Sequence, residues 1–512
     1  MTVARAAVYA PRERSITIGL TNVTLALVLI VGAAVRLWSL DSVPPELHPD
    51  EYAGWLGVTD MLNGHNPPSV FLNYAVVYLP LYGVFEAVSV WLLDGTIASF
   101  RLPAALLGVA TALATGLFAY RLVPRRAVLL FAAGIMAILP WDVSVSRIGW
   151  EPAPMLPFLL FGLYFLHRGL FARSERDLSI GFALLAIGAY SYRAESFYAV
   201  TLVVALLAVE FQRTRANARG LANGFAIGLL ILIPLIYSVI TQPHSLTSGP
   251  AQGTFDPGVN SGSLREFGSL YVAHFAPAAL FLVGDGNLQH GPATGVLYPW
   301  MAPFIVAGFL APLRLFALRP RIFALVWLAL YPLGGSLTDD DGHQHFIRTL
   351  AGAPLFTIVA AIGVVACWQW LASLLARSRF RTSIVAATIT LFGAVVAVEF
   401  AQFCDTYFVR YPIASAKIFH YGDRQIFDFV KANDAGYDRV CFTVLDAWNY
   451  SALIRFYMRD QPISLSETAD ACKVPPSLLA VQSPREAPIG SHLIGTVQNR
   501  DGTIRAYFYT FP

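Results

Sequence analysis

Residues 350–373 read LAGAPLFTIVAAIGVVACWQWLAS and contain no charged side chain. A helix crosses a bilayer core of about 30 Å with roughly 20 apolar residues, so this stretch predicts a transmembrane helix. The same criterion selects ten more windows, at about 16–38, 100–120, 127–146, 152–171, 178–194, 196–211, 220–241, 294–313, 322–338 and 383–403. We therefore predict a polytopic α-helical membrane protein with about eleven transmembrane helices.

The composition of the whole chain agrees with membrane insertion. The 512 residues are 56% hydrophobic and 13% charged, with a mean hydropathy of +0.58, whereas soluble proteins carry about 25% charged residues. This composition excludes a soluble cytosolic enzyme. A net charge of +3 gives no reason to expect a nucleic-acid partner, and four cysteines are too few for a disulfide-built scaffold.

The placement of arginine predicts the orientation, because positively charged loops stay in the cytoplasm. Arginine-rich segments alternate along the chain with segments that hold only Arg147, Arg193, Arg265 and Arg348. The rich segments contain Arg5, Arg12 and Arg14; Arg121, Arg125 and Arg126; Arg168, Arg173 and Arg176; Arg213, Arg215 and Arg219; Arg314, Arg319 and Arg321; and Arg377, Arg379 and Arg381. We therefore expect a plasma- or inner-membrane protein with a cytoplasmic N-terminus and an extracytoplasmic C-terminus. Window 16–38 has no small-residue cleavage site before Trp38 and is expected to remain as an anchor.

This alternation also decides how the apolar stretch 75–93 is interpreted. If that stretch crossed the membrane, every later arginine-rich loop would lie outside. Pro80 and Glu86 interrupt it as well. We predict an interfacial or re-entrant helix against the outer face.

The chain divides into two predicted domains. Residues 1–403 form the membrane domain, with a first outer loop at 39–74 and a long outer loop at 242–293. Residues 404–512 have the composition of a small soluble domain, predicted to be α/β and extracytoplasmic. Its predicted helices cover 423–434 and 448–460, and its predicted strands cover 437–445, 477–483, 492–499 and 503–511. Cys441 and Cys472 either pair in the outer compartment or remain two separate thiols.

The first outer loop contains the sequence Leu47-His48-Pro49-Asp50-Glu51-Tyr52. Adjacent carboxylates at a membrane interface suit base catalysis, in which Asp50 takes a proton from an acceptor hydroxyl and Glu51 binds substrate or orients its neighbour. The alternative is structural, since acidic residues favour the first turn of a helix. A divalent cation held by His48, Asp50 and Glu51 is a further alternative, although the spacing matches no strong ligand pattern.

Two more outer segments carry candidate residues. Ser146-Arg147-Ile148-Gly149-Trp150-Glu151 places Arg147 and Glu151 four residues apart, either as a structural ion pair or as a functional site. Arg193 and Glu195 repeat this pairing at another outer helix end. The loop before window 350–373 holds His343, His345 and Arg348, which suit a phosphate. Three acids in the same loop, Asp339, Asp340 and Asp341, weaken the positive field around these residues. The long outer loop contains weaker candidates: His274, Asp285 and His290.

Together these segments resemble the GT-C membrane glycosyltransferases, in the branch of protein O-mannosyltransferases and aminoarabinose transferases. The resemblance covers nearly the whole chain. Its pieces, in order, are HPDEYAGWLGVTDMLNG at 48–64, FRLPAALLG at 100–108, AYRL at 119–122, SRIGWEPAPM at 146–155, GDGNLQHGPATGVLYP at 284–299, TDDDGHQHFIRTLAGAP at 338–354 and FYMRD at 456–460.

The resemblance implies transfer of a sugar from a polyprenyl-phosphate donor to a hydroxyl of a lipid, glycan or protein, on the outer face. It assigns the catalytic base to Asp50 with Glu51 beside it, and a second acid to Glu151. It assigns the donor phosphate to Arg348, His345 and Arg193. The basic residue that many relatives carry late in the first outer loop is missing here. The alternative functions are a transporter or lipid flippase, and a noncatalytic relative of the same fold.

Overall fold

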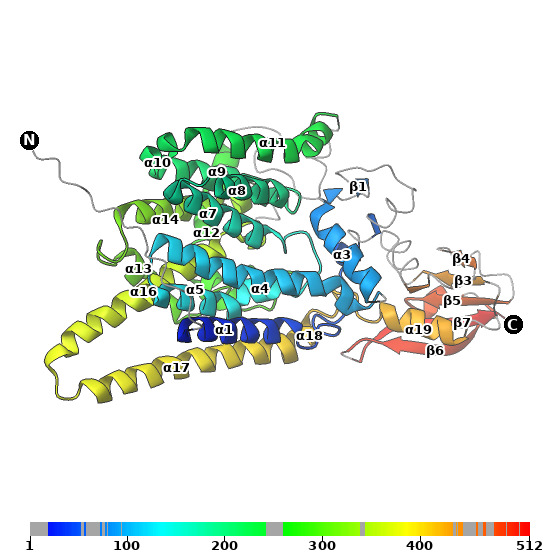
Figure 1. Ribbon diagram of the computed structural model, residues 1–512. Coiled ribbons are helices and arrows are strands. Elements are labelled where there is room, and N and C mark those ends of the chain that lie inside the picture. The colour runs from blue at the N-terminus through cyan, green and yellow to red at the C-terminus, as the bar shows by residue number, and fades with distance from the viewer. Residues whose placement is uncertain are drawn as a thin grey trace, which may run out of the picture.

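The protein consists of a helical bundle with a small β-sheet at one end (Figure 1). The computed structural model describes residues 19–52, 56–57, 72–73, 77–78, 80–93, 95–241, 260–337, 344–433, 437, 439–443, 457–458, 464–466, 476–487, 489–500 and 502–511.

Each of the eleven predicted windows contains a helix. The bundle helices are α1 (Leu20–Leu37), α3 (Pro80–Leu92), α4 (Ile97–Leu122), α5 (Arg126–Ile138), α6 (Pro140–Val145), α7 (Met155–Ala172), α8 (Glu175–Gly188), α9 (Arg193–Val209), α10 (Phe211–Ala216), α11 (Ala218–Thr241), α12 (Ser261–Ala273), α13 (Met301–Phe309), α14 (Leu318–Leu330), α15 (Leu333–Ser336), α16 (Gly352–Leu374) and α17 (Arg381–Asp405). Within the described part of the chain, six helical stretches are long and apolar enough to cross a membrane: Leu20–Leu37, Ile97–Leu122, Met155–Ala172, Ala218–Thr241, Gly352–Arg377 and Arg381–Ala414.

Several other windows are broken by proline. Window 127–146 divides into α5 and α6 at Leu139, because Pro140 starts a new helix and lacks the N–H that would continue the previous one. Window 322–338 divides in the same way around Pro332, between α14 and α15. The stretch at 75–93 contains α3, whose 13 residues span about 20 Å, less than the bilayer core.

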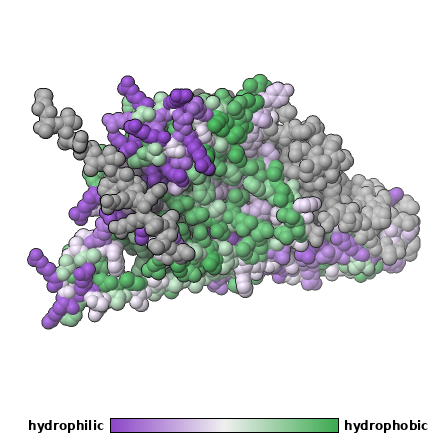
Figure 2. Space-filling model, viewed as in Figure 1, coloured by the Kyte–Doolittle hydropathy of each residue, from purple (hydrophilic) through white to green (hydrophobic). Residues whose placement is uncertain are grey.

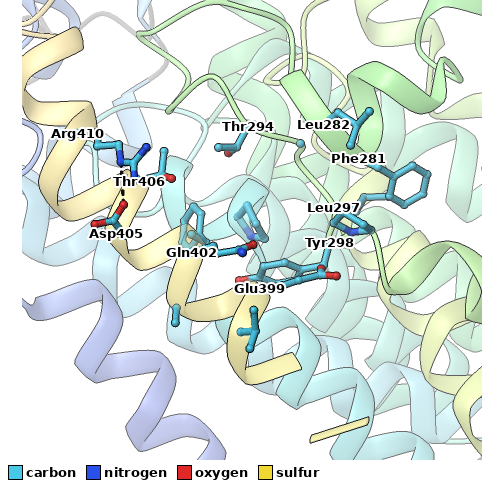
Figure 3. Close-up of a pocket in the computed structure, with 16 residues that line it drawn as sticks. Phe281, Leu282, Thr294, Leu297, Tyr298, Glu399, Gln402, Asp405, Thr406 and Arg410 are labelled. Carbon is cyan, nitrogen blue, oxygen red and sulfur yellow. Dashed lines mark hydrogen bonds and ion pairs between the residues drawn. The ribbon is translucent and has the colours of Figure 1, made fainter. Parts of the chain in front are cut away.

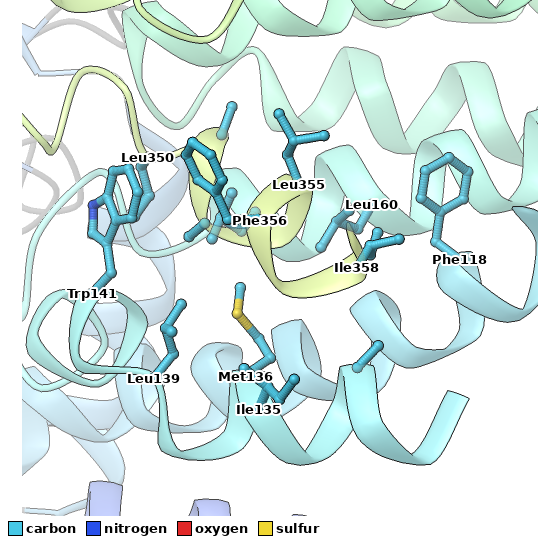
Figure 4. Close-up of a cluster of buried hydrophobic side chains, with 14 of the residues drawn as sticks. Phe118, Ile135, Met136, Leu139, Trp141, Leu160, Leu350, Leu355, Phe356 and Ile358 are labelled. Atoms are coloured by element: carbon cyan, nitrogen blue, oxygen red, sulfur yellow. The ribbon is translucent and has the colours of Figure 1, made fainter. Parts of the chain in front are cut away.

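The centre of the bundle is apolar and closely packed. Phe118 of α4, Met136 of α5, Leu160 of α7 and Ile358 of α16 all belong to one buried cluster (Figure 4). Glycine brings α13 and α16 into backbone contact, since a Cβ added at Gly363 would lie 1.8 Å from the carbonyl oxygen of Phe304. Figure 2 shows the outside of the bundle as an apolar band with polar residues at its ends, as a bilayer requires.

A buried cation ties α1 to the broken helix. Arg36 donates to the carbonyl oxygens of Met136 (3.3 Å) and Ala137 (2.6 Å) at the end of α5, and its Nη2 lies 2.5 Å from Asp142 Oδ2 on α6. Its Nε also donates to Ser146 Oγ at 2.9 Å. These contacts fix the start of the segment that leads to Glu151.

The C-terminal part follows α17 directly. After a π-helical turn at Thr406–Arg410 come α18 (Tyr411–Ala414) and α19 (Asp423–Asn433), so the predicted boundary at 403/404 falls in the last turn of α17. The sheet has the order β4-β3-β5-β7-β6, with β4 and β5 parallel to β3, and β7 antiparallel to β5 and β6. Its strands are β3 (Arg439–Phe442), β4 (Ser464–Ser466), β5 (Ser477–Val481), β6 (His492–Gln498) and β7 (Ile504–Phe511). A separate two-stranded ladder, β1 (Leu72–Asn73) with β2 (Val77–Tyr78), precedes α3.

These strands agree with the prediction for the C-terminal domain, to which the structure adds β4. Of the predicted helix 448–460, only Tyr457 and Met458 are described. Cys441 on β3 is disulfide-bonded, while Cys472, its suggested partner, lies outside the described residues. Leu47 and Tyr52, which follow α1, share one core with Ile426 and Phe427 of α19, so the chain around these two residues packs against the C-terminal part of the protein.

Candidate functional site

Asp50 lies in the first helical turn after the loop that follows α1. Gln289 Nε2 donates to Asp50 Oδ2 at 2.6 Å, and the Asp50 backbone N–H donates to His48 Nδ1 at 3.2 Å. The Asp50 side chain is 29% exposed. Its carboxylate is therefore held in place while remaining accessible to a substrate.

Glu51 has the opposite environment, although it is the next residue. Its side chain is fully buried, and its two oxygens accept bonds from Arg101 Nε (2.8 Å) and Nη2 (3.0 Å), Gly149 N (2.8 Å) and His48 N (2.8 Å). These four bonds occupy the carboxylate. Glu51 thus connects the first outer loop, α4 and the segment before Glu151, and this geometry favours a positioning role over contact with substrate or metal.

Two buried arginines shape the loop after α1. Arg101 Nη1 donates to the carbonyl oxygens of Leu40 (3.2 Å) and Pro44 (2.8 Å). Arg147 donates to the carbonyl oxygens of Val35 (2.7 Å), Arg36 (2.8 Å), Trp38 (2.8 Å) and Val43 (2.8 Å). These bonds from Arg147, suggested above as a substrate ligand or as the ion-pair partner of Glu151, favour a role in supporting the loop.

Glu151 lies in the turns between α6 and α7 and is partly buried. Its removal from water, together with the negative charge of Asp50, raises the pKa of Glu151 to about 8, although Arg193 acts in the opposite direction. Arg193 begins α9 and interacts electrostatically with both Glu151 and Arg348. Arg348 also bonds Tyr192. Arg193 thus lies between Glu151 and the second arginine, Arg348, in this set of interactions.

His345 joins this group from the segment before α16. Its Nδ1 accepts the backbone N–H of Arg348 at 3.3 Å, and its own N–H donates to His274 Nε2 at 3.3 Å. Burial, followed by the nearby His290 and Arg348, lowers the pKa of His345 well below its ordinary value. His345 is therefore a neutral group next to Arg348, and its contact with the donor phosphate stays a prediction. His343 lies outside the described residues.

The segment 284–291, GDGNLQHG, contributes the remaining residues of the candidate site. His290 Nδ1 lies 2.6 Å from Asp285 Oδ2, and this oxygen also accepts the N–H of Phe346 at 3.1 Å. Burial acts to raise the pKa of Asp285, but the charge and hydrogen bond of His290 outweigh it and the pKa is lowered. Gly291 has φ +152°, and a Cβ there would lie 2.7 Å from Ser144 Oγ, so the segment can take this path only with glycine.

These contacts and electrostatic interactions connect the candidate residues one to the next. Asp50 interacts with Glu151, Glu151 with Arg193, and Arg193 with Arg348. The centroids of the His345 and His290 rings lie 4.5 Å apart. Gln289, which precedes His290, donates a hydrogen bond to Asp50. Sequence reasoning missed Gln289, Tyr192 and Arg101, although GDGNLQHG had been singled out around Gln289. Throughout the described residues, no group of three or more His, Cys, Asp and Glu side chains is placed to hold a metal ion.

A separate cavity of about 810 Å³ lies between α17 and the segment after the π-helical turn at Ala279–Val283. Glu399 and Gln402 of α17 face Leu297 and Tyr298 across it (Figure 3). Its walls are largely apolar and continue to Thr406 and Arg410. The residue after Arg410 is Tyr411, whose Oη donates to the carbonyl oxygen of Leu288 at 2.6 Å, so the cavity adjoins the segment that bonds Asp50.

The fold is that of the GT-C membrane glycosyltransferases. ArnT from Cupriavidus metallidurans in its apo state matches with a TM-score of 0.57 and 13% identity, over 95% of this chain and 97% of that chain. Its structure bound to undecaprenyl phosphate gives a TM-score of 0.58, 14% identity and the same coverage. The Archaeoglobus fulgidus oligosaccharyltransferase AglB, in complex with an inhibitory peptide and a dolichol-phosphate, gives 0.52 and 13%, over 87% of this chain and 64% of that chain.

At the sequence level, residues 80–237 match the family described as dolichyl-phosphate-mannose-protein mannosyltransferase. No curated protein sequence matches significantly. The family match and the shared fold confirm the resemblance to GT-C membrane glycosyltransferases of the O-mannosyltransferase and ArnT branch.

Proposed function

We propose that the protein is a membrane glycosyltransferase that moves a sugar from a polyprenyl-phosphate donor to an acceptor hydroxyl on the outer face of the membrane. The observation that carries this proposal is a series of electrostatic interactions, in which the partly exposed carboxylate of Asp50 acts on Glu151, Glu151 on Arg193, and Arg193 on Arg348. A base and two cations connected in this way match the needs of the reaction, which removes one proton and releases one phosphate.

In the proposed reaction, Asp50 accepts the proton of the acceptor hydroxyl while the hydroxyl oxygen forms a bond to the anomeric carbon. The bond from that carbon to the phosphate oxygen breaks, and the polyprenyl phosphate leaves with the electron pair. A single displacement inverts the anomeric configuration. Arg348 and Arg193 stabilise the leaving phosphate, and one well-placed donor of this kind contributes about 3 kcal/mol.

The other acids have different proposed roles. With its pKa raised to about 8, Glu151 is protonated at neutral pH and donates a hydrogen bond to the sugar instead of acting as a second base. Glu51, held by Arg101, positions Asp50.

A lipid-linked donor is supported by two further observations. The largely apolar cavity beside α17 has room for hydrocarbon and adjoins the segment that holds Gln289. The structures of similar fold include ArnT bound to undecaprenyl phosphate and AglB in complex with a dolichol-phosphate. The acceptor hydroxyl belongs to a lipid, a glycan or a protein.

The test is a transfer assay with the full chain in lipid nanodiscs. Radiolabelled polyprenyl-phosphate sugars are supplied one at a time with a membrane extract as the acceptor source. We expect one donor to label an extract component with the wild-type protein, and Asp50→Asn, the matched control, to leave it unlabelled. Absence of transfer from every donor, with a folded protein, would contradict the proposal.

A further inference from the structure

Two arginines from different helices lie against one aromatic ring near α10, at the end of the bundle opposite the sheet (Figure 1). The ring is that of Phe171, in the last turn of α7. The guanidinium carbon of Arg213 on α10 lies 3.6 Å from its centroid, and that of Arg121 on α4 lies 5.8 Å from it. Asn217, which follows α10, donates from Nδ2 to the carbonyl oxygen of Leu170 at 3.1 Å. The ends of α4 and α7 therefore meet α10 at this ring.

Two buried carboxylates pair with three of the arginines at this end of the bundle. Glu210 Oε2 is shared, because it lies 3.2 Å from both Arg213 Nε and Arg319 Nη1. Asp177 Oδ2 lies 2.9 Å from Arg168 Nε, one turn before Phe171 on α7. Three cations thus face two anions, and one positive charge remains.

Arg121 adds a second positive charge. Its Nε donates to His167 Nδ1 at 3.4 Å, and a ring nitrogen that accepts an N–H carries no proton, so this histidine is neutral. Among the described residues no carboxylate pairs with Arg121, and its Nη1 and Nη2 form no hydrogen bond. The side chain is half-buried, and the charge of Arg168 acts on it with the same sign. A partly desolvated cation in this position favours an anionic ligand.

The surroundings of these cations match a lipid better than a soluble anion. Phe171 is 39% exposed and Phe211, two residues before Arg213, is 62% exposed, so apolar rings lie open beside the charges. In the predicted orientation this end of the bundle lies at the cytoplasmic leaflet, whose surface carries anionic lipids. Basic pockets between transmembrane helices on that side bind lipid headgroups.

We propose that Arg121 and Arg213, beside Phe171, bind the phosphate of an anionic phospholipid of the cytoplasmic leaflet. Arg121 offers Nη1 and Nη2 to the phosphate oxygens, in the two-point geometry that suits guanidinium and phosphate, and Arg213 supplies a second cation. The acyl chains cover Phe171 and Phe211. The bound lipid joins the ends of α4 and α7 to α10 and stabilises the bundle, whether or not the protein transfers sugar.

The test is thermal unfolding of the full chain in an uncharged detergent with added lipid. Dioleoyl phosphatidylglycerol should raise the wild-type melting temperature by about 2 °C or more, because a ligand that binds only the folded state stabilises it. Dioleoyl phosphatidylcholine, which has the same chains but no net charge, and inorganic phosphate should leave the melting temperature unchanged. No rise with phosphatidylglycerol, or an equal rise with phosphatidylcholine, would overturn the proposal. An equal rise with inorganic phosphate would assign the residues to a soluble anion and overturn it as well.

Variants locate the binding site on the chain. Arg121→Gln should raise the phosphatidylglycerol concentration that gives half of the shift by about tenfold or more. Arg213→Gln carries the same expectation and decides the outcome if Arg121→Gln does not fold. Arg379→Gln is the matched control and should leave this concentration unchanged, because Arg379 is an exposed residue between α16 and α17, at the same end of the bundle, and lies 4.7 Å from the ring centroid of Phe380. Equal effects of Arg379→Gln and Arg121→Gln would show a general attraction to charged lipid and contradict a site at Phe171.

Discussion

Glu51 and Arg101 form a two-point ion pair, with Nε 2.8 Å from Oε1 and Nη2 3.0 Å from Oε2, and neither side chain is exposed to solvent. Asp50, one residue earlier, is 29% exposed and is bonded by a neutral amide. Two adjacent acids therefore have separate tasks, one in holding the loop and one in facing the substrate.

Removing one partner of the buried pair should destabilise the protein. Arg101→Met leaves the Glu51 carboxylate buried without its cation, and the expected cost is about 3–5 kcal/mol. Thermal unfolding in detergent measures this loss. Arg101→Met combined with Glu51→Gln removes both charges and should recover part of the stability; an unaltered melting temperature in the single variant would refute the structural role.

Asp50→Asn should abolish proton acceptance while preserving structure. Asparagine has the size and shape of aspartate, and its side-chain oxygen can still accept from Gln289. We expect turnover to fall by about 10²–10⁴ with an unchanged melting temperature. A stable and active variant would remove Asp50 as the base and leave Glu151 as the candidate.

Arg348→Ala should weaken use of the donor more than use of the acceptor. Loss of a charge-assisted bond to phosphate costs about 1.5–3 kcal/mol, which corresponds to a rise of about ten- to a hundredfold in the KM for the donor. Titration of donor and acceptor separately measures the difference. Arg424→Ala is the control, because Arg424 lies on α19, is largely exposed and pairs with Asp428 at 3.8 Å; equal effects of the two variants would remove Arg348 from the phosphate site.

Stability should depend on pH through Glu46, which is 4% exposed. Burial raises the pKa of Glu46 from 4.5 to about 7, although Arg424 and Arg101 act against it. Because the folded-state pKa lies above the unfolded one, the stabilisation is complete below pH 4.5 and is lost as the pH rises through 7. The loss is about 3 kcal/mol.

Melting temperatures at pH 5 and pH 8 measure this dependence. Glu46→Gln stays neutral and should reduce the difference between the two temperatures. Since Tyr457 Oη donates to Glu46 Oε2 at 3.5 Å, the variant also reports on the contact between the first outer loop and the C-terminal domain. An equal difference in both proteins would exclude Glu46 as its source.

The orientation can be tested with reporter fusions. The arginine alternation predicts that a reporter active outside the cytoplasm works after Pro512 and fails near Arg215. In the structure, α10 and the connection from α16 to α17 lie at the end of the bundle opposite the sheet (Figure 1), as this prediction requires. The reverse pair of results would place the Asp50 loop on the cytoplasmic face.

The helices could be predicted because their signal is local. A run of apolar residues such as 350–373 must form backbone hydrogen bonds within itself in a bilayer, and α16 occupies Gly352–Leu374. The sequence also shows where the prolines lie, but the prediction underestimated how much they shorten the helices. Window 127–146 was predicted as a single span, and the structure divides it into α5 and α6. The short strand β4 carries too few residues for a pattern of its own and depends on pairing with β3.

Within the candidate site, the sequence determined which residues could react and at which helix ends they lie. Only the tertiary structure decided between neighbours, because burial and hydrogen bonding are set by segments far apart in the chain. Arg101, 50 residues from Glu51, occupies that carboxylate, and Gln289, 239 residues from Asp50, bonds the other. The sequence shows two adjacent acids. The contact from α4 buries Glu51 in a structural ion pair, and the contact from segment 284–291 holds Asp50 while leaving it accessible to substrate.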